Sequence, residues 1–98
     1  MVIISKTVLA NFYEAEPKAK EPLLSWYHLA KESDWNNFSE VKKSYNSVDS
    51  VGNKRFVFNI GGNKYRLVVL MFFNVRTIYI RFIGTHKEYD KISNIKKV

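Results

Sequence analysis

The chain has 98 residues, of which 46% are hydrophobic and 15% aromatic, so it can bury the core of one compact domain but has no room for a separate cofactor-binding domain. It contains no cysteine and only two histidines, His28 and His86, which excludes a disulfide framework, a thiolate nucleophile and a cysteine-based zinc site. The net charge of +7 is uneven, because residues 50–98 carry +8 and residues 1–49 carry −1. We therefore expect a single domain over residues 1–98, with no metal and no cofactor.

The chain begins with a short apolar run, residues 2–4, which predicts a first strand. Ser5 is then expected to cap the N-terminus of a helix, and Pro17 marks the point where the helical pattern pauses. The side chains expected on the buried face of this helix are Val8, Leu9 and Phe12.

A second helix is predicted from Glu21, with Pro22 in its first turn. Its buried face is expected to contain Leu23, Trp26, Tyr27 and Ala30. His28, inside this helix, is expected to be structural rather than catalytic. A short third helix is predicted to begin near Asn37 or Ser39, and the polar residues 46–54 are expected to form a turn region.

The basic half changes from a helical to an alternating pattern. The stretches "KRFVFNI", "NKYRLVVLMFF" and "TIYIRFIG" predict three antiparallel strands over residues 54–60, 63–73 and 77–84. Gly61 and Gly62 predict a two-residue hairpin, which would pair Phe58 with Tyr65 and Asn59 with Lys64. We expect one apolar sheet face covered by the helices and an opposite face that is cationic. The fold class is therefore α+β, a mainly antiparallel sheet with N-terminal helices on one face.

The stretch "THKEYD", residues 85–90, follows the last predicted strand. Thr85 and Glu88 match a capping box, so a short C-terminal helix is expected to begin here. His86 would then lie beside the backbone N–H groups at the helix start, a position that favours phosphate. Tyr89 and Asp90 fall one turn further on, within reach of His86 and Thr85.

A group of cations is expected beside His86, because the predicted hairpin brings Lys64, Arg66 and Arg81 to one side of the sheet. Such a group suits phosphate recognition, and the basic half as a whole favours RNA or DNA as partner. Metal-free RNA cleavage needs a base for the 2′-hydroxyl, cations for the phosphate and an acid for the 5′-oxygen, and all three kinds of group are present. The alternatives are a basic RNA-binding or ribosome-binding domain without catalysis, a partner-binding scaffold, and charge that serves solubility alone.

Two long segments, "VFNIGGNKYRLVV" (57–69) and "IYIRFIGTHKEYDKI" (78–92), together with "SWYHLAKESDWNNFSEVKKSY" upstream, resemble the HigB family of bacterial type II toxins. The resemblance covers nearly the whole chain. It implies a RelE-like fold and a ribosome-dependent endoribonuclease that cuts mRNA and inhibits translation. It also implies a HigA-like antitoxin with a helix-turn-helix, and contact with operator DNA only through the toxin–antitoxin complex.

The resemblance also implies a set of site residues. Of these, His86 is expected to be the acid–base group, with a lysine such as Lys64 left open as the base, and Tyr89 to stack on a base or donate a proton. Arg66 and Arg81 would clamp the scissile phosphate, with Lys64 in support. The residues expected to bind RNA are Asn59, Arg55, Lys54, Thr85, Lys87 and Asp90.

Two further expectations concern location and the antitoxin. No stretch approaches the roughly 20 apolar residues of a membrane span, so we expect a soluble protein of the bacterial cytoplasm with no membrane contact. The apolar run "LMFF", residues 70–73, is expected to belong either to the core or to the antitoxin contact.

Overall fold

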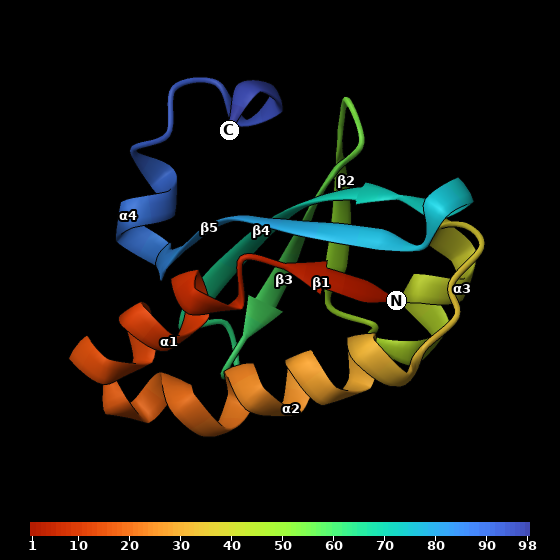
Figure 1. The fold of residues 1–98 in the computed structure, drawn as a ribbon. Coiled ribbons are helices and arrows are strands. Elements are labelled where there is room, and N and C mark those ends of the chain that lie inside the picture. Colours follow the sequence, from red (N-terminus) through yellow and green to blue (C-terminus); the bar gives the residue numbers. More distant parts are fainter.

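The computed structural model describes residues 1–98, which form five strands and four α-helices (Figure 1). Short 3-10 turns occur at Pro17–Ala19, Phe73–Val75 and Ile95–Lys97. The elements in chain order are β1 Val2–Ile4, α1 Lys6–Ala15, α2 Lys20–Glu32, α3 Phe38–Ser44, β2 Val48–Gly52, β3 Arg55–Ile60, β4 Tyr65–Phe72, β5 Thr77–Thr85 and α4 His86–Asp90.

The strands form one sheet in the order β1-β5-β4-β3-β2. β1 runs parallel to β5, and every other pair is antiparallel. Helices α1 and α2 lie against one face, whereas α4 and the C-terminal residues lie on the opposite side (Figure 1). The predicted α+β architecture is therefore confirmed. No helix combines the length and apolar character needed to cross a membrane.

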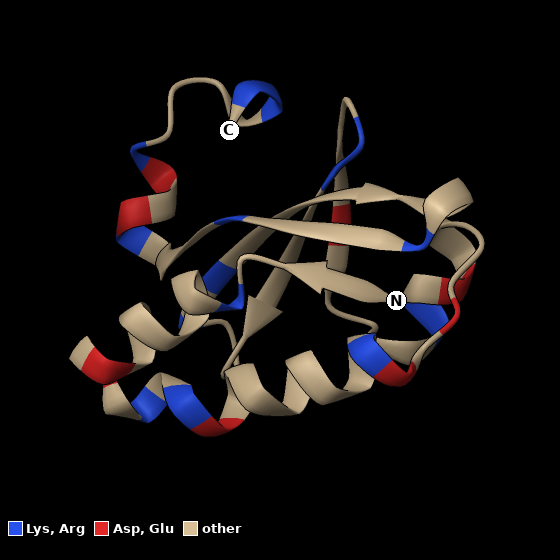
Figure 2. Ribbon diagram, in the orientation of Figure 1, with Lys and Arg blue, Asp and Glu red and all other residues tan.

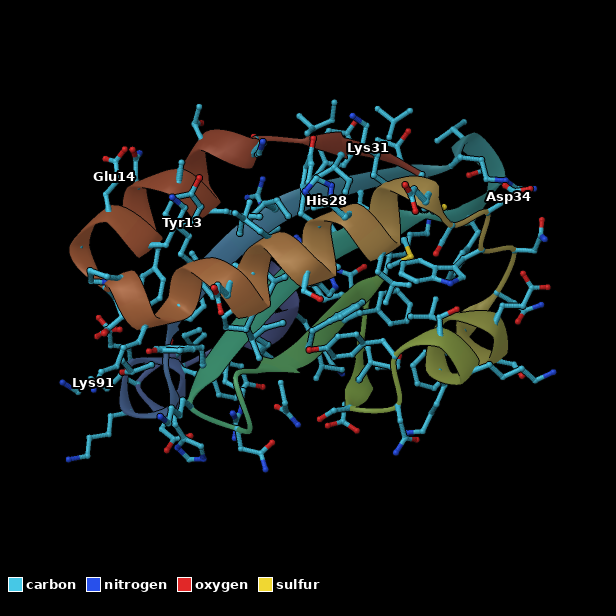
Figure 3. The ribbon with its side chains drawn as sticks, turned by 90° about the horizontal axis from the view of Figure 1, so that it is seen from below. Tyr13, Glu14, His28, Lys31, Asp34 and Lys91 are labelled. Carbon is cyan, nitrogen blue, oxygen red and sulfur yellow. The ribbon has the colours of Figure 1, made fainter.

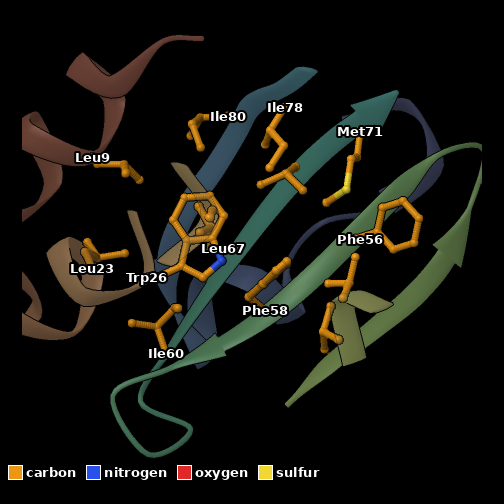
Figure 4. Packing of buried hydrophobic residues seen from close by; sticks show 14 of the residues in the cluster. Leu9, Leu23, Trp26, Phe56, Phe58, Ile60, Leu67, Met71, Ile78 and Ile80 are labelled. Carbon is orange, nitrogen blue, oxygen red and sulfur yellow. The ribbon is translucent and has the colours of Figure 1, made fainter. Parts of the chain in front are cut away.

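The main core lies between the two long helices and the sheet. Leu9 of α1 and Leu23 and Trp26 of α2 point at the sheet residues Phe58 and Leu67 (Figure 4). All five side chains are at most 1% exposed, and the Trp26 ring meets Phe58 edge-on at 5.3 Å. Burial of such large side chains contributes roughly 1.5–3 kcal/mol each, so this contact fixes the helices on the sheet.

Several expectations for the first half need correction. Ser5 does precede α1, but it adopts a left-handed conformation (φ 73°) and its side chain caps nothing. α2 begins at Lys20, one residue before the predicted start, and Tyr27 is half-buried. His28 is exposed on α2 (Figure 3), and its expected role as structural rather than catalytic stays a prediction.

The prediction for the third helix was confirmed, whereas the prediction for the segment after it was wrong. Asn37 caps α3 as predicted, since its side-chain oxygen accepts a hydrogen bond from the Glu40 amide at 3.0 Å. The polar residues 46–54 were wrongly predicted as a turn region, because they contain the edge strand β2. A sheet edge needs only one apolar side chain facing the core, which here is Val48, so the polarity of the other residues concealed the strand.

The β3–β4 hairpin differs from its predicted register. Asn59 pairs with Arg66 and Ile60 with Tyr65, so the loop has four residues, Gly61 to Lys64, instead of two. Gly61, Gly62 and Asn63 have φ values of 63°, 62° and 74°, and three successive left-handed residues make the wider turn. The register is shifted by two residues, which keeps every side chain on its predicted face. Lys64, however, lies in the turn and not in the strand.

β5 is interrupted by a bulge at Arg81. Ile80 pairs with Val69 and Phe82 with Val68, so Arg81 has no partner on β4. The extra residue moves Phe82 to the sheet face opposite Ile80, although the alternation of the sequence placed both on the core face. Arg81 itself keeps its predicted face, which is the one opposite α1 and α2.

The face opposite α1 and α2 is not the open cationic surface that the sequence predicted. Its centre is apolar and buried, with Val57 3% and Val68 0% exposed. The C-terminal residues cross this side of the sheet (Figure 1), where Arg55 donates to the Val98 carbonyl oxygen from Nε at 3.1 Å and from Nη2 at 3.0 Å. Part of the predicted open face is therefore covered by the protein itself.

The "LMFF" run divides between the two faces. Met71 is 1% exposed and belongs to the main core, whereas Leu70 and Phe72 lie on the opposite face and are half-buried. The Phe72 ring meets Tyr79 edge-on at 5.9 Å.

Candidate functional site

The start of α4 is fixed by the predicted capping box. The Thr85 amide donates to Glu88 Oε1 at 2.8 Å, and the Glu88 amide donates to Thr85 Oγ1 at 3.2 Å. This reciprocal pair ends β5 and turns the chain sharply into the helix. It therefore determines where His86, the first helical residue, projects.

The His86 ring lies in close contact with the Asp90 carboxylate. Its Nδ1 lies 2.9 Å from Asp90 Oδ2, with the two side chains 53% and 57% exposed. A carboxylate at Nδ1 holds the proton on that nitrogen, so in the neutral ring Nε2 carries the lone pair. The spacing i,i+4 on α4 thus orients the imidazole and leaves Nε2 as the nitrogen that can accept a proton.

The β3–β4 turn lies directly beside His86. The His86 amide donates to the Lys64 carbonyl oxygen at 3.2 Å, and the neighbouring pair Tyr65 and Thr85 lie opposite each other on β4 and β5. These contacts hold Lys64 and His86 together although 22 residues separate them. The Lys64 side chain is exposed.

Arg66 belongs to the same region. Its Nη1 donates to the carbonyl oxygens of Asn63 at 2.9 Å and Tyr65 at 3.2 Å, which folds the side chain over the turn. On the sheet it lies between Asn59 of β3 and Gly84 of β5. We call the group formed by Lys64, Arg66, His86 and Asp90 the hairpin corner.

Three backbone amides at the start of α4 are not free for a phosphate. Thr85 and Glu88 satisfy each other, and the His86 amide is bonded to Lys64. The Glu88 carboxylate also lies at the positive end of the helix, where it opposes a second anion. A phosphate at the hairpin corner would therefore be held mainly by side chains.

Three other candidates lie near the hairpin corner. Tyr89 is half-buried on α4, and Lys87 is exposed beside His86. Arg81 is exposed at the β5 bulge, on the same sheet face as Arg66, and takes part in neither of the two salt bridges in the protein. Its guanidinium has no anionic partner, so it remains available for a phosphate.

Lys54 and Arg55 are not brought to this corner. Arg55 lies at the opposite end of β3 from Asn59, four residues away at about 3.3 Å per residue. Its guanidinium is bonded to Val98, and the Lys54 ammonium lies over the Phe72 ring, 5.0 Å from its centre. Both candidates therefore form a separate cationic end of the sheet.

The charges are distributed as the sequence indicated. Figure 2 shows most acidic residues on helices, with Lys and Arg along the second half of the chain and its C-terminal turn. No cluster of three or more His, Cys, Asp or Glu side chains has the arrangement of a metal site. The side chains at the hairpin corner can offer one proton acceptor and several cations.

One contact of the hairpin corner was predicted from the sequence and one feature was missed. Asp90 was expected within reach of His86, and the i,i+4 contact is present. That Asp90 also binds RNA stays a prediction. Gly84 was seen only as a strand end, but a Cβ there would lie 2.6 Å from Phe82 Cζ and 3.0 Å from Glu88 Oε1. Only glycine allows β5 and α4 to approach this closely.

Residues 19–92 match the HigB toxin family, described as the RelE-like toxic component of a toxin–antitoxin system. The chain belongs to this family. Every candidate residue from Lys54 to Asp90 lies within the matched segment. The resemblance inferred from the sequence is thereby confirmed, and membership implies a cognate antitoxin as partner.

Individual relatives agree with this assignment. The chain is 33% identical over 92 residues to the mRNA interferase toxin HigB of Escherichia coli K12, which covers 92% of this chain and 88% of that protein. The mRNA interferase HigB of Shigella flexneri gives the same identity and coverage. The mRNA interferase HigB of Escherichia coli O6:H1 is 30% identical over 95 residues, or 95% of this chain and 92% of that protein.

Proposed function

We propose that this HigB-family toxin cleaves mRNA at the hairpin corner while the mRNA is held by a translating ribosome. Family membership and the names of its relatives make it a toxin with mRNA endoribonuclease activity. The observation that carries the proposed location is the His86–Asp90 pair at 2.9 Å, held by the His86 amide against the turn residue Lys64, two residues before Arg66 of β4. This arrangement supports a site with a proton acceptor beside cations that bind phosphate.

The chemistry proceeds by attack of the neighbouring 2′-hydroxyl. His86 Nε2 takes the proton of this hydroxyl as its oxygen bonds to phosphorus, and the bond from phosphorus to the 5′-oxygen breaks. The products are a 2′,3′-cyclic phosphate and a 5′-hydroxyl, whose proton comes from Tyr89, from the protonated His86 or from water. General acid–base catalysis of this kind contributes about 10²–10⁴-fold.

The cations have separate roles in this scheme. Arg66 and Arg81 bind the scissile phosphate and stabilise the extra negative charge that develops on it, and Lys64 supports them from the turn. Asp90 is a positioning residue, since it acts only through the His86 ring. Asn59, Thr85 and Lys87 surround this group and contact the RNA on either side, and Lys54 and Arg55 contact more distant phosphates.

The partners follow from the same proposal. The toxin acts where translation occurs, in the bacterial cytoplasm, and no cofactor takes part. A HigA-like antitoxin with a helix-turn-helix inhibits it, and the pair contacts operator DNA through the antitoxin.

The test is 5′-end mapping of a defined mRNA in a reconstituted translation reaction. Wild-type protein is compared with His86→Ala and Arg66→Ala, and with His28→Ala as a matched control, since His28 is exposed on the far helical face. We expect cuts with wild type and His28→Ala only, and none without ribosomes.

Cuts at the same sites in naked RNA would overturn ribosome dependence. Cuts that survive His86→Ala would move the base elsewhere, with Lys64 the next candidate. The absence of any cut by wild-type protein would leave an RNA-binding domain without catalysis.

A further inference from the structure

Two adjoining hollows lie between α3 and the β3–β4 turn. The first, of about 700 Å³, is lined by Phe38, Ser39, Lys42, Lys43 and Asn46. The second, of about 470 Å³, is lined by Ser44, Tyr45, Asn46, Ser47, Asn59, Gly62 and Asn63. Asn46 lines both, so the two hollows adjoin at this residue, and we call them together the α3 channel.

The lining of the α3 channel favours an anionic, polar ligand. It contains two lysines, three asparagines and three serines, and no carboxylate. Lys42 donates to the Val48 carbonyl oxygen at 3.3 Å, and neither lysine takes part in a salt bridge. The one acidic residue of α3, Glu40, is bonded to the Asn36 amide at 2.8 Å. The positive charge at the channel is therefore not neutralised by the protein.

Aromatic rings are placed where bases could stack. Phe38, half-buried beside the lysines, stacks against Phe56 at 5.7 Å and so presents a fixed ring at the first hollow. Amides and hydroxyls from the second hollow can bond to base edges and to 2′-hydroxyls. An aromatic ring with lysines and neutral polar groups is the combination that binds single-stranded RNA.

The α3 channel ends at the hairpin corner. Asn59, in its lining, pairs across the sheet with Arg66, and Arg66 Nη1 donates to the carbonyl oxygen of Asn63, also in its lining, at 2.9 Å. Gly62 leaves this end open, because nothing lies within 4 Å of the position that a Cβ would take. An RNA strand bound at Arg66 therefore enters the channel without leaving the protein surface.

We propose that the α3 channel is a subsite for single-stranded RNA, which holds the mRNA nucleotides next to the scissile phosphate. This inference rests on the proposed cleavage at the hairpin corner. Lys42 and Lys43 bind phosphates, Phe38 stacks on a base, and Asn46 and Asn59 bond to base or ribose groups.

The test compares Lys42→Ala/Lys43→Ala with Lys18→Ala/Lys20→Ala, which removes two lysines near the start of α2. Both variants lose the same charge, and α3 tolerates alanine well. In the reconstituted cleavage reaction at about 0.1 M salt, we expect the α3 pair to raise KM by about five-fold for each lysine–phosphate interaction removed, with kcat unchanged. The control pair should leave KM within about two-fold of wild type.

An RNA-binding measurement tests the α3 channel independently of the proposed catalysis. With His86→Ala as background, a single-stranded RNA oligonucleotide is bound at several salt concentrations. Removal of Lys42 and Lys43 should reduce the salt slope by about 0.7 for each phosphate that these lysines bind. Equal KM values and equal slopes for the two double variants overturn the α3 channel, whereas an absence of cleavage by wild type overturns the catalytic proposal alone.

Photo-crosslinking identifies the bound strand. With 4-thiouridine placed beside the cleavage site of the mRNA, crosslinks should map to residues 38–47 on ribosomes stalled with His86→Ala. Crosslinks from the 4-thiouridine that map only to ribosomal RNA, or to parts of the toxin outside residues 38–47, would refute the assignment to mRNA.

Discussion

Gly84→Ala tests how closely β5 and α4 must approach to form the hairpin corner. The added methyl group would lie 2.6 Å from Phe82 Cζ and 3.0 Å from Glu88 Oε1. Phe82 pairs across the sheet with the fully buried Val68, so its backbone is held in place and its ring must turn to admit the methyl group. Overpacking of this kind costs about 1–3 kcal/mol. For a domain of this size, each 1 kcal/mol lowers the melting temperature by about 4–8 °C, so we expect a loss of roughly 4–24 °C.

The assay combines thermal unfolding, urea unfolding and mRNA cleavage. Because Gly84 lies between Arg66 and the capping box, cleavage should fall even at temperatures where the variant is folded. Phe82→Ala provides the matched control, since it removes the ring that the new methyl group meets. In the double variant, Gly84→Ala should cost much less than it does alone, which a double-mutant cycle measures directly. A single variant within about 0.5 kcal/mol of wild type, or strict additivity of the two changes, would refute this steric argument.

Three further predictions concern the chemistry and the core. Asp90→Asn should lower kcat with KM and thermal stability unchanged, because it disturbs the tautomer of His86 and not the fold; an unchanged kcat would remove Asp90 from the mechanism. A 2′-deoxynucleotide on the 5′ side of the cut should abolish cleavage at that site alone, and mass spectrometry of the normal product should find a 2′,3′-cyclic phosphate; persistent cutting would exclude 2′-hydroxyl attack. Burial, with a smaller effect of Glu16, raises the pKa of the Tyr65 phenol above its ordinary value near 10. The unfolded chain therefore loses this proton at lower pH than the folded chain, so the contribution of Tyr65 to stability is complete below pH 10 and is lost as the pH rises through the raised pKa. Tyr65→Phe should therefore make the free energy of unfolding fall less steeply with pH in the alkaline range. Identical curves for the two proteins would contradict the assignment.

Apart from Phe82, which the bulge at Arg81 moves to the other face, the face of the strand residues was predictable, whereas their exact partners were not. The two-residue alternation survives a register shift of two, so Phe58 and Leu67 are in the core although their predicted partners were wrong. Hairpin loop length depends on backbone angles, and the sequence "GGNK" is compatible with both a two-residue and a four-residue turn. The bulge at Arg81 had no local signal, because it is set by contacts of β5 with β4.

The candidate site was predictable where it depends on local spacing. The capping box and the position of His86 follow from four consecutive residues, and the i,i+4 relation to Asp90 follows from the helix. The sequence did not predict that Lys54 and Arg55 lie away from this site. Their position depends on which end of β3 faces the turn and on where residues 91–98 lie. Long-range contacts, and not residue type, therefore determine which cationic side chains lie close together in the fold.

The covered part of the sheet face opposite α1 and α2 limits how RNA can reach the hairpin corner in the proposed function. An open cationic face would let a strand cross the sheet, but Val57 and Val68 are buried there and Arg55 is bonded to Val98. The corner remains accessible at the β3–β4 turn, where Lys64 is exposed and Gly62 has open space around it. Under the proposed function, a substrate approaches the ends of β3 and β4 at this turn, and the α3 channel leads to the same place through Asn59. In that case the C-terminal residues that cover part of the sheet face would also direct the RNA toward α3.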